Sequence, residues 1–99
     1  MAEFLDVDPQ SLRLPPSRRD GAEPSKLQRH IALHGKSVQG MPPLEVTRGK
    51  DGELMITSGV TRATRVAKLL PGQTVRVEVT EVYPNWDFSK LPTVGDKLP

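Results

Sequence analysis

The sequence has no cysteine, few aromatic residues and no long apolar run among its 99 positions. Without cysteine the chain cannot form disulfides, thiolate metal sites or a cysteine nucleophile. Because no apolar run reaches the about 18 residues that span a bilayer, we expect no membrane association. The acidic first residues, MAEFLDVD, lack the pattern of a signal peptide. These features together predict a cytoplasmic protein.

The hydrophobic content is also low, at 35%, while the chain holds 10 prolines and 8 glycines. This composition predicts one small domain with a modest core. The net charge of +2 is too small to indicate nucleic-acid binding by itself. The basic residues are clustered, however, and the two clusters are Arg13, Arg18 and Arg19 near the start and Arg62, Arg65 and Lys68 further along.

Hydrophobic periodicity and turn residues predict six elements. In chain order these are a strand over 4–7, a helix over 26–34 capped by Ser25 and ended by Gly35, a hairpin of two strands over 44–57, a helix over 60–70 and a strand over 74–80. This order predicts a small α+β domain, with a mixed sheet and two main helices on one side of it. The expected division of the chain is a first strand within 1–8, a Pro-rich basic loop over 9–24, a core over 25–82 and a partly flexible extension over 83–99.

The most informative stretch is the junction between the second hairpin strand and the second helix. A strand that ends in Ser58-Gly59 and turns directly into a helix leaves free backbone N–H groups at the positive end of the helix dipole. Thr61 adds a hydroxyl, and Arg62 and Arg65 add guanidinium groups suited to phosphate oxygens. The pattern therefore suits a phosphate group, although a solvated cationic helix face with a serine cap would have the same sequence.

Three segments carry a resemblance to a known family, in the order SKLQRHIALHG, QGMPPLEV and ELMITSGVTRATRVAKLLPGQTVRVEV. Together they make residues 25–80 similar to the ParB/sulfiredoxin superfamily, also called the ParB-like nuclease domain. The resemblance implies that a Gly-x-x-Arg turn holds nucleotide phosphates. It implies a site lined by Gly59, Thr61 and Arg62, approached by His30 and Gln39. The implied ligand is a nucleotide such as CTP or ATP, and a bound nucleotide would bring Mg²⁺ with it.

The chain departs from the family at the position that carries catalysis. Partition-type relatives have a glutamate after the glycine and sulfiredoxins have a cysteine, whereas this chain has Val60. Valine can neither transfer a proton nor act as a nucleophile. Sulfiredoxin activity is thus excluded, and nucleotide hydrolysis by the family's arrangement is not expected. The helix-turn-helix region of partition proteins is also missing, so we expect a lone domain or part of a longer chain.

Other side chains are candidates for chemistry. His30 and His34 have the i, i+4 spacing of metal ligands, but no third histidine exists, and we expect a structural role and no metal site. A nuclease would need converging carboxylates, and the candidates Asp51, Glu53, Asp6 and Asp8 do not converge in the sequence. Tyr83, Trp86 and Phe88 are expected to pack on the core, with base stacking as the alternative. Arg13, Arg18 and Arg19 either contact nucleic-acid phosphates or belong to a flexible, solvated arm.

Three hypotheses follow from the sequence. The first is a ParB/sulfiredoxin-like binding module that holds a nucleotide or nucleic-acid phosphate at the Gly59–Arg65 turn without efficient catalysis. The second is an enzyme, either a ParB-like nuclease or a nucleotide hydrolase. The third is a protein-interaction domain with a vestigial pocket.

Overall fold

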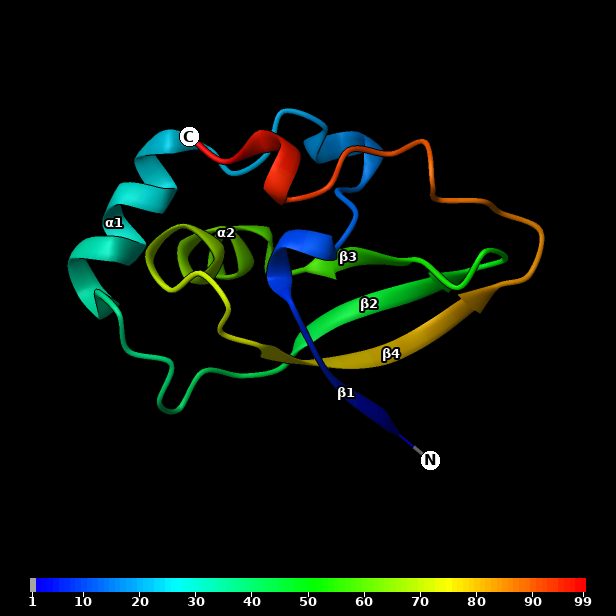
Figure 1. The fold of residues 1–99 in the computed structure, drawn as a ribbon, viewed down its shortest axis with the longest axis horizontal. Helices are drawn as coiled ribbons and strands as arrows, with labels where there is room; N and C mark the ends of the chain where they lie inside the picture. Colours follow the sequence, from blue (N-terminus) through cyan, green and yellow to red (C-terminus); the bar gives the residue numbers. More distant parts are fainter. Residues whose placement is uncertain (1) are drawn as a thin grey trace.

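The computed structural model describes residues 2–99, which form a small α+β fold with a four-stranded mixed sheet and two α-helices (Figure 1). The elements are β1 (Glu3–Val7), α1 (Pro24–His34), β2 (Leu44–Gly49), β3 (Leu54–Ser58), α2 (Val60–Leu69) and β4 (Val75–Tyr83). Short 3-10 turns lie at Pro9–Ser11, Pro16–Arg18 and Gly95–Lys97. The fold class and the order of the elements agree with the sequence prediction.

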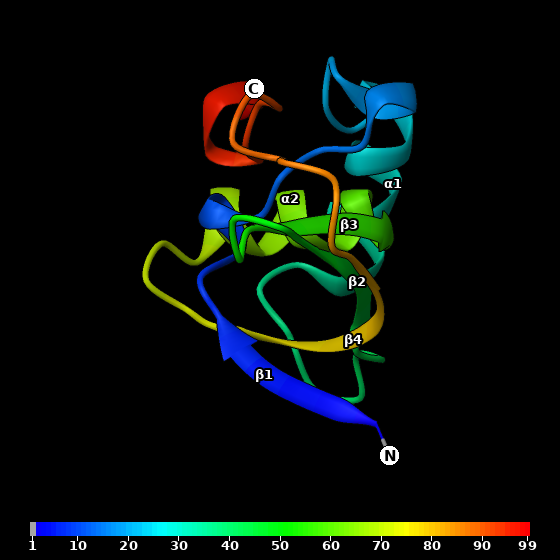
Figure 2. The ribbon, with the colours of Figure 1, turned by 90° about the vertical axis from the view of Figure 1, so that its right-hand side faces the viewer.

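The strands lie in the order β1-β4-β2-β3. β4 pairs antiparallel with β1 and parallel with β2, and β2 and β3 form the expected antiparallel hairpin. Figure 2 shows α2 and the C-terminal 3-10 turn on the same side of β4, with α1 beside α2. The alternating valines of β4 explain its place in the sheet, because Val75 and Val77 are buried under α2 while Arg76 between them is exposed.

The apolar core lies between the sheet and α2. Its buried members are Leu12, Leu14, Leu44, Val46, Ile56, Val60, Ala63, Val66, Ala67, Val75, Val77 and Val94. α2 contributes on several sides, since all its residues from Ala63 to Ala67 are buried. A helix enclosed to this degree is held by tertiary packing more than by its own propensity, so the turn that begins it has a firmly determined position.

The start of α1 corrects one sequence expectation. The helix begins at Pro24, with Glu23 at the N-cap position, and not after a capping Ser25. Proline is favoured in the first turn because the N–H that it lacks has no partner there in any helix. The hydroxyl of Ser25 donates instead to the Glu23 carboxylate, at 2.6 Å. Gly35 ends the helix as expected.

The segment over 9–24 is not a solvated arm. Leu12 and Leu14 are fully buried, and the segment adds to the β3 edge of the sheet through Arg13, whose backbone N–H donates to the Leu54 carbonyl at 2.8 Å. The C-terminal extension packs on it in turn, because the N–H of Val94 donates to the Leu12 carbonyl at 2.9 Å. Both segments therefore complete the core. Their proline-rich composition gave no indication of this packing.

The Arg13 side chain fastens these segments together. Its Nε donates to the Glu53 carboxylate at 2.8 Å, and its Nη1 donates to the carbonyls of Ser89 and Leu91 at 3.2 and 2.9 Å. Arg13→Ala is expected to lower the free energy of unfolding by about 1–3 kcal/mol, because charge-assisted hydrogen bonds are lost. The matched control is Arg19→Ala, an exposed position that should change it by less than about 0.5 kcal/mol. Urea denaturation of both variants measures the difference, and equal midpoints would contradict this role for Arg13.

The three aromatic residues after β4 behave differently from one another. Phe88 is buried, as expected, whereas Trp86 is 64% exposed and Tyr83 is 38% exposed. The expectation that all three pack on the core is therefore wrong for Trp86 and Tyr83. Their rings contact each other at the surface, with centroids 6.4 Å apart.

Candidate functional site

The turn between β3 and α2 has the geometry that exposes backbone N–H groups. Gly59 is the N-cap residue of α2 with φ 109° and ψ 23°, in the left-handed region that favours glycine. No side chain caps the helix, so the serine cap considered from the sequence is not formed. The first intrahelical bond runs from the Ala63 N–H to the Gly59 carbonyl at 2.9 Å. The N–H groups that precede it, at Val60, Thr61 and Arg62, have no intrahelical acceptor.

The Arg62 side chain folds back over this turn. Its Nη2 and Nε lie 2.9 and 3.2 Å from the place where a Cβ on residue 59 would stand. Its Nη1 donates to the carbonyl of Pro42 at 3.2 Å. The remaining N–H groups of the guanidinium are available to a ligand at the helix start. The backbone angle thus favours glycine at 59, and a Cβ there would also overlap Cδ2 of the buried Leu44.

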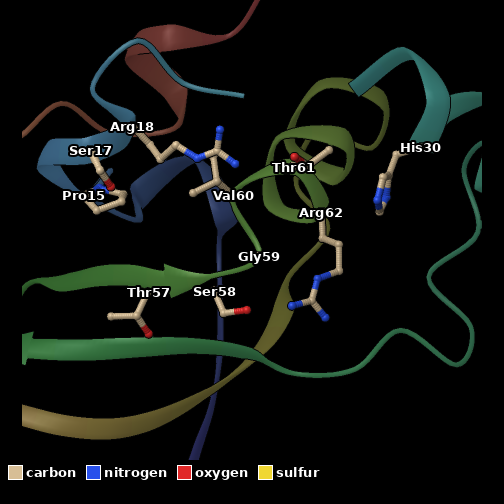
Figure 3. Close-up of a pocket in the computed structure, with 10 residues that line it drawn as sticks. All are labelled: Pro15, Ser17, Arg18, His30, Thr57, Ser58, Gly59, Val60, Thr61 and Arg62. Carbon is tan, nitrogen blue, oxygen red and sulfur yellow. The ribbon is translucent and has the colours of Figure 1, made fainter. Parts of the chain in front are cut away.

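The turn opens into a pocket of about 610 Å³. Figure 3 shows its lining residues, which come from three parts of the chain: Arg18 from the N-terminal segment, His30 from α1, and the run from Thr57 to Arg62. None of the residues that line this pocket is acidic. Two guanidinium groups and a helix N-terminus around a space without carboxylates create a local positive potential.

Most of the site residues predicted from the sequence meet in this pocket. Ser58, Gly59, Thr61, Arg62, His30 and Arg18 all line it. Pro15, Ser17 and Thr57 line it as well and were missed by sequence reasoning. In the sequence, these residues are marked only by a neighbouring basic or turn residue. Pro15 and Ser17 could not be assigned to the pocket, because the N-terminal segment reaches it through long-range packing.

Arg65 does not line this pocket of about 610 Å³, although Arg62 does. It is 2% exposed, and its Nη1 donates to the carbonyls of Gly35 and Ser37, both at 2.8 Å. Burial lowers the pKa of its guanidinium below the usual value. Arg65 is therefore not part of a solvated cationic helix face, and it is not among the residues that line the larger pocket. Its buried side chain joins α2 to the loop that follows α1.

A smaller cavity of about 100 Å³ lies next to the pocket and contains Gln39, Arg65 and His34 among its lining residues. His30 and Arg62 line both spaces. Gln39 thus lies near the turn but does not reach the larger pocket. The other two arginines of the N-terminal cluster, Arg13 and Arg19, line a different hollow together with Asp96 and Lys97.

Apart from His30, the remaining candidates for chemistry do not line the larger pocket. The rings of His30 and His34 are neighbours, with centroids 5.5 Å apart, and residues 2–99 contain no group of three or more potential metal ligands around them or elsewhere. Glu53 pairs with Arg13, and Asp6 pairs with Arg76 at 3.3 Å. The carboxylates considered for a nuclease are therefore dispersed.

Comparisons with known proteins return no match, neither to a family model nor to a curated protein. Within the part of the chain that the structure describes, no helix has the length and apolar character needed to cross a membrane.

Proposed function

We propose that this chain is a ParB/sulfiredoxin-like binding module that holds a phosphate group of a nucleotide at the turn from Ser58 to Arg62. The observation that carries the proposal is the uncapped start of α2 at Gly59, which opens into an acid-free pocket between Arg18 and Arg62. Free N–H groups at the positive end of a helix dipole bind phosphate readily. Arginines supply planar, charge-assisted hydrogen bonds to the same oxygens.

The pocket is large enough for a nucleotide. Its volume of about 610 Å³ lies within the range of about 300–1,000 Å³ that is usual for small-molecule sites. Mg²⁺ prefers carboxylate, carbonyl and water oxygens, and the lining residues offer no carboxylate to it. A magnesium ion would therefore have to be held by the nucleotide's own phosphates and by water.

Binding without efficient catalysis is part of the proposal. Val60 occupies the position where the family carries its glutamate or cysteine, and its side chain is 6% exposed within the apolar core. It offers no group that accepts or donates a proton. No aspartate or glutamate lines the pocket to replace it. The pocket lining therefore supports binding better than it supports the enzyme hypothesis.

The test is a titration of the ¹⁵N-labelled protein with CTP, ATP and a short DNA duplex, followed by NMR. Saturable shifts of the backbone amides from Ser58 to Arg62 are expected with at least one nucleotide. Arg62→Ala and Arg18→Ala should each weaken that binding about tenfold or more, because each removes a charge-assisted hydrogen bond to phosphate. The matched control is Arg19→Ala, which removes the same charge from the same segment but does not line the pocket.

Two outcomes would contradict the proposal. If no nucleotide moves these amides at millimolar concentration, the pocket is vestigial, and a protein partner becomes the better hypothesis. If the DNA duplex alone moves them, and Arg19→Ala weakens that binding as much as Arg62→Ala does, the ligand is the nucleic-acid backbone and the contact is spread over the basic surface.

A further inference from the structure

The smaller cavity beside the nucleotide pocket contains a buried charge without a counter-ion. Arg65 is 2% exposed, and none of the ion pairs found among residues 2–99 includes it. A buried charge is costly unless it is paired. The side chains around the cavity add to the cost, because the ionisable ones are His30, His34, Arg62 and Arg65 itself, and none is acidic.

The hydrogen bonds of Arg65 leave the Nε–Nη2 edge of its guanidinium without a strong acceptor. Nη1 is satisfied by two backbone carbonyls, whereas the hydrogen bond found for Nη2 among residues 2–99 goes to the sulfur of Met41, at 3.7 Å. Nε is buried and has no partner within the described residues. Nε and Nη2 form the parallel pair of donors that binds a carboxylate or phosphate through two oxygens. A thioether is a weak acceptor that an oxyanion would displace.

A second buried polar atom belongs to another residue that lines this cavity. Nδ1 of His30 has no hydrogen-bond partner among residues 2–99, and His30 lines the cavity with Arg65. Two residues with unsatisfied buried polar atoms around one cavity are unusual, since most buried polar atoms have a partner. The cavity volume of about 100 Å³ exceeds the roughly 30 Å³ that one water occupies in the liquid, so it has room for a group of several heavy atoms.

We propose that this cavity is a second anion site, which takes a small oxyanion such as a phosphate or carboxylate group on the Nε–Nη2 edge of Arg65. The oxyanion neutralises the buried guanidinium and accepts a hydrogen bond from the protonated ring of His30. The site does not require the proposed function, because Arg65 belongs to this cavity and not to the nucleotide pocket. The oxyanion is either a free anion or a second phosphate group of the pocket's ligand, since His30 and Arg62 border both spaces.

Occupancy should change the titration of His30. Burial first, and then the nearby His34, Arg65 and Arg62, lower the pKa of His30 from its usual 6.5. Arg18 also faces it across the larger pocket. In the empty protein the imidazolium is disfavoured, so stability falls as the pH drops through the unfolded-state value of about 6.5, and the loss is complete below the folded-state pKa. An anion beside the ring favours the imidazolium. The affinity of the protein for the anion should therefore rise as the pH falls from about 6.5 to the folded-state pKa of His30.

The experiment is an NMR titration of the whole chain with sodium phosphate and with sodium acetate, against sodium chloride at equal ionic strength. Expected results are a saturable downfield shift of the Arg65 Nε–H signal, a shift of the Met41 methyl signal and a rise in the pKa of His30. Arg65→Lys keeps the charge but loses the two-donor edge, and it should weaken binding about tenfold. Arg29→Gln removes a charge from exposed α1 surface outside the cavity and should change nothing.

A second variant keeps the test valid if Arg65→Lys does not fold. His30→Gln should weaken anion binding and abolish its pH dependence, while saturating anion still shifts the Arg65 Nε–H signal. The proposal is overturned if neither oxyanion moves the Arg65 Nε–H signal beyond the chloride control at millimolar concentration, as expected for a water-filled cavity. Phosphate that shifts only the amides from Ser58 to Arg62 would overturn it too, and would leave the nucleotide pocket standing.

An ATP titration distinguishes the two sources of the oxyanion, and either result supports the site once the phosphate arm has succeeded. If ATP shifts the Gly59 amide and the Arg65 Nε–H signal with one affinity, both anionic groups belong to one ligand. If ATP shifts only the Gly59 amide, the cavity takes a free oxyanion. If phosphate shifts Arg65 while no nucleotide shifts Gly59, the second site exists and the proposed function fails.

Discussion

Gly59→Ala is expected to lower the free energy of unfolding by about 2–5 kcal/mol, a large part of the stability of so small a domain. Two physical effects add. The left-handed backbone at φ 109° costs an alanine about 1–2 kcal/mol. The new Cβ would also overlap Cδ2 of the fully buried Leu44 and crowd the Arg62 guanidinium, and overpacking of this kind costs about 1–3 kcal/mol.

The control for Gly59 is Gly52→Ala in the β2–β3 turn. Gly52 also has a positive φ, 81°, but no atom lies within 4 Å of the place where its Cβ would stand. Gly52→Ala should therefore lower the free energy of unfolding only by the cost of the left-handed backbone, about 1–2 kcal/mol. Urea denaturation compares the two variants. Equal losses would show that Leu44 and Arg62 yield to the new methyl group, and that the turn is less tightly packed than the structure shows.

Arg65→Ala is the second change with a large expected effect, a loss of about 2–4 kcal/mol of stability. The variant loses two hydrogen bonds from a charged donor to the carbonyls of Gly35 and Ser37, and bonds of this type are worth about 1.5–3 kcal/mol each. Removing a buried charge offsets part of this loss. The link between α2 and the loop after α1 should weaken, so amides over 36–43 should exchange faster with solvent.

Arg62→Ala is the matched control, three positions earlier on the same helix. Arg62 is only half-buried and makes a single 3.2 Å bond to Pro42, so its loss should cost about 0.5 kcal/mol or less. The two arginines thus separate stability from ligand binding. Arg65 variants should change the midpoint of unfolding, and Arg62 variants should change the affinity for nucleotide. Arg62→Ala as destabilising as Arg65→Ala would contradict this division.

The two proposed sites have a common physical origin. Both lie where α2 meets chain segments between β1 and β2, and both are lined by cationic groups and by no carboxylate. In the larger pocket the positive groups are a helix N-terminus and two partly exposed arginines, which a solvated ligand can reach. In the smaller cavity the charge is buried, so an anion there would act on stability as well as on binding.

Local patterns were sufficient for the elements of the fold. The alternating valines of β4, the Asp51-Gly52 turn and the break after Leu70 each act over a few residues, and the strands and helices appear where these patterns place them. β4 extends to Tyr83, beyond its expected end. The reason is pairing with β2, whose Gly49 lies opposite Tyr83 and continues the ladder past the last alternating valine.

The candidate site could be predicted in part for the same reason. Ser58, Gly59, Thr61 and Arg62 are contiguous, so their relation follows from a single strand-to-helix turn. The burial of Arg65 could not be predicted, because it depends on hydrogen bonds to the carbonyls of a loop about 30 positions earlier. The contribution of Arg18 depends likewise on the burial of Leu12 and Leu14, which docks the N-terminal segment on the core.

The amino-acid sequence by itself determined the secondary structure, the α+β class and the glycine at the start of α2, since these depend on backbone preferences and on periodicity within short stretches. The tertiary structure alone decided which basic residues face a pocket and which are buried. It also decided that the proline-rich segment and the C-terminal extension complete the core. These outcomes depend on contacts between residues far apart in the chain, where burial and long-range hydrogen bonding outweigh local composition.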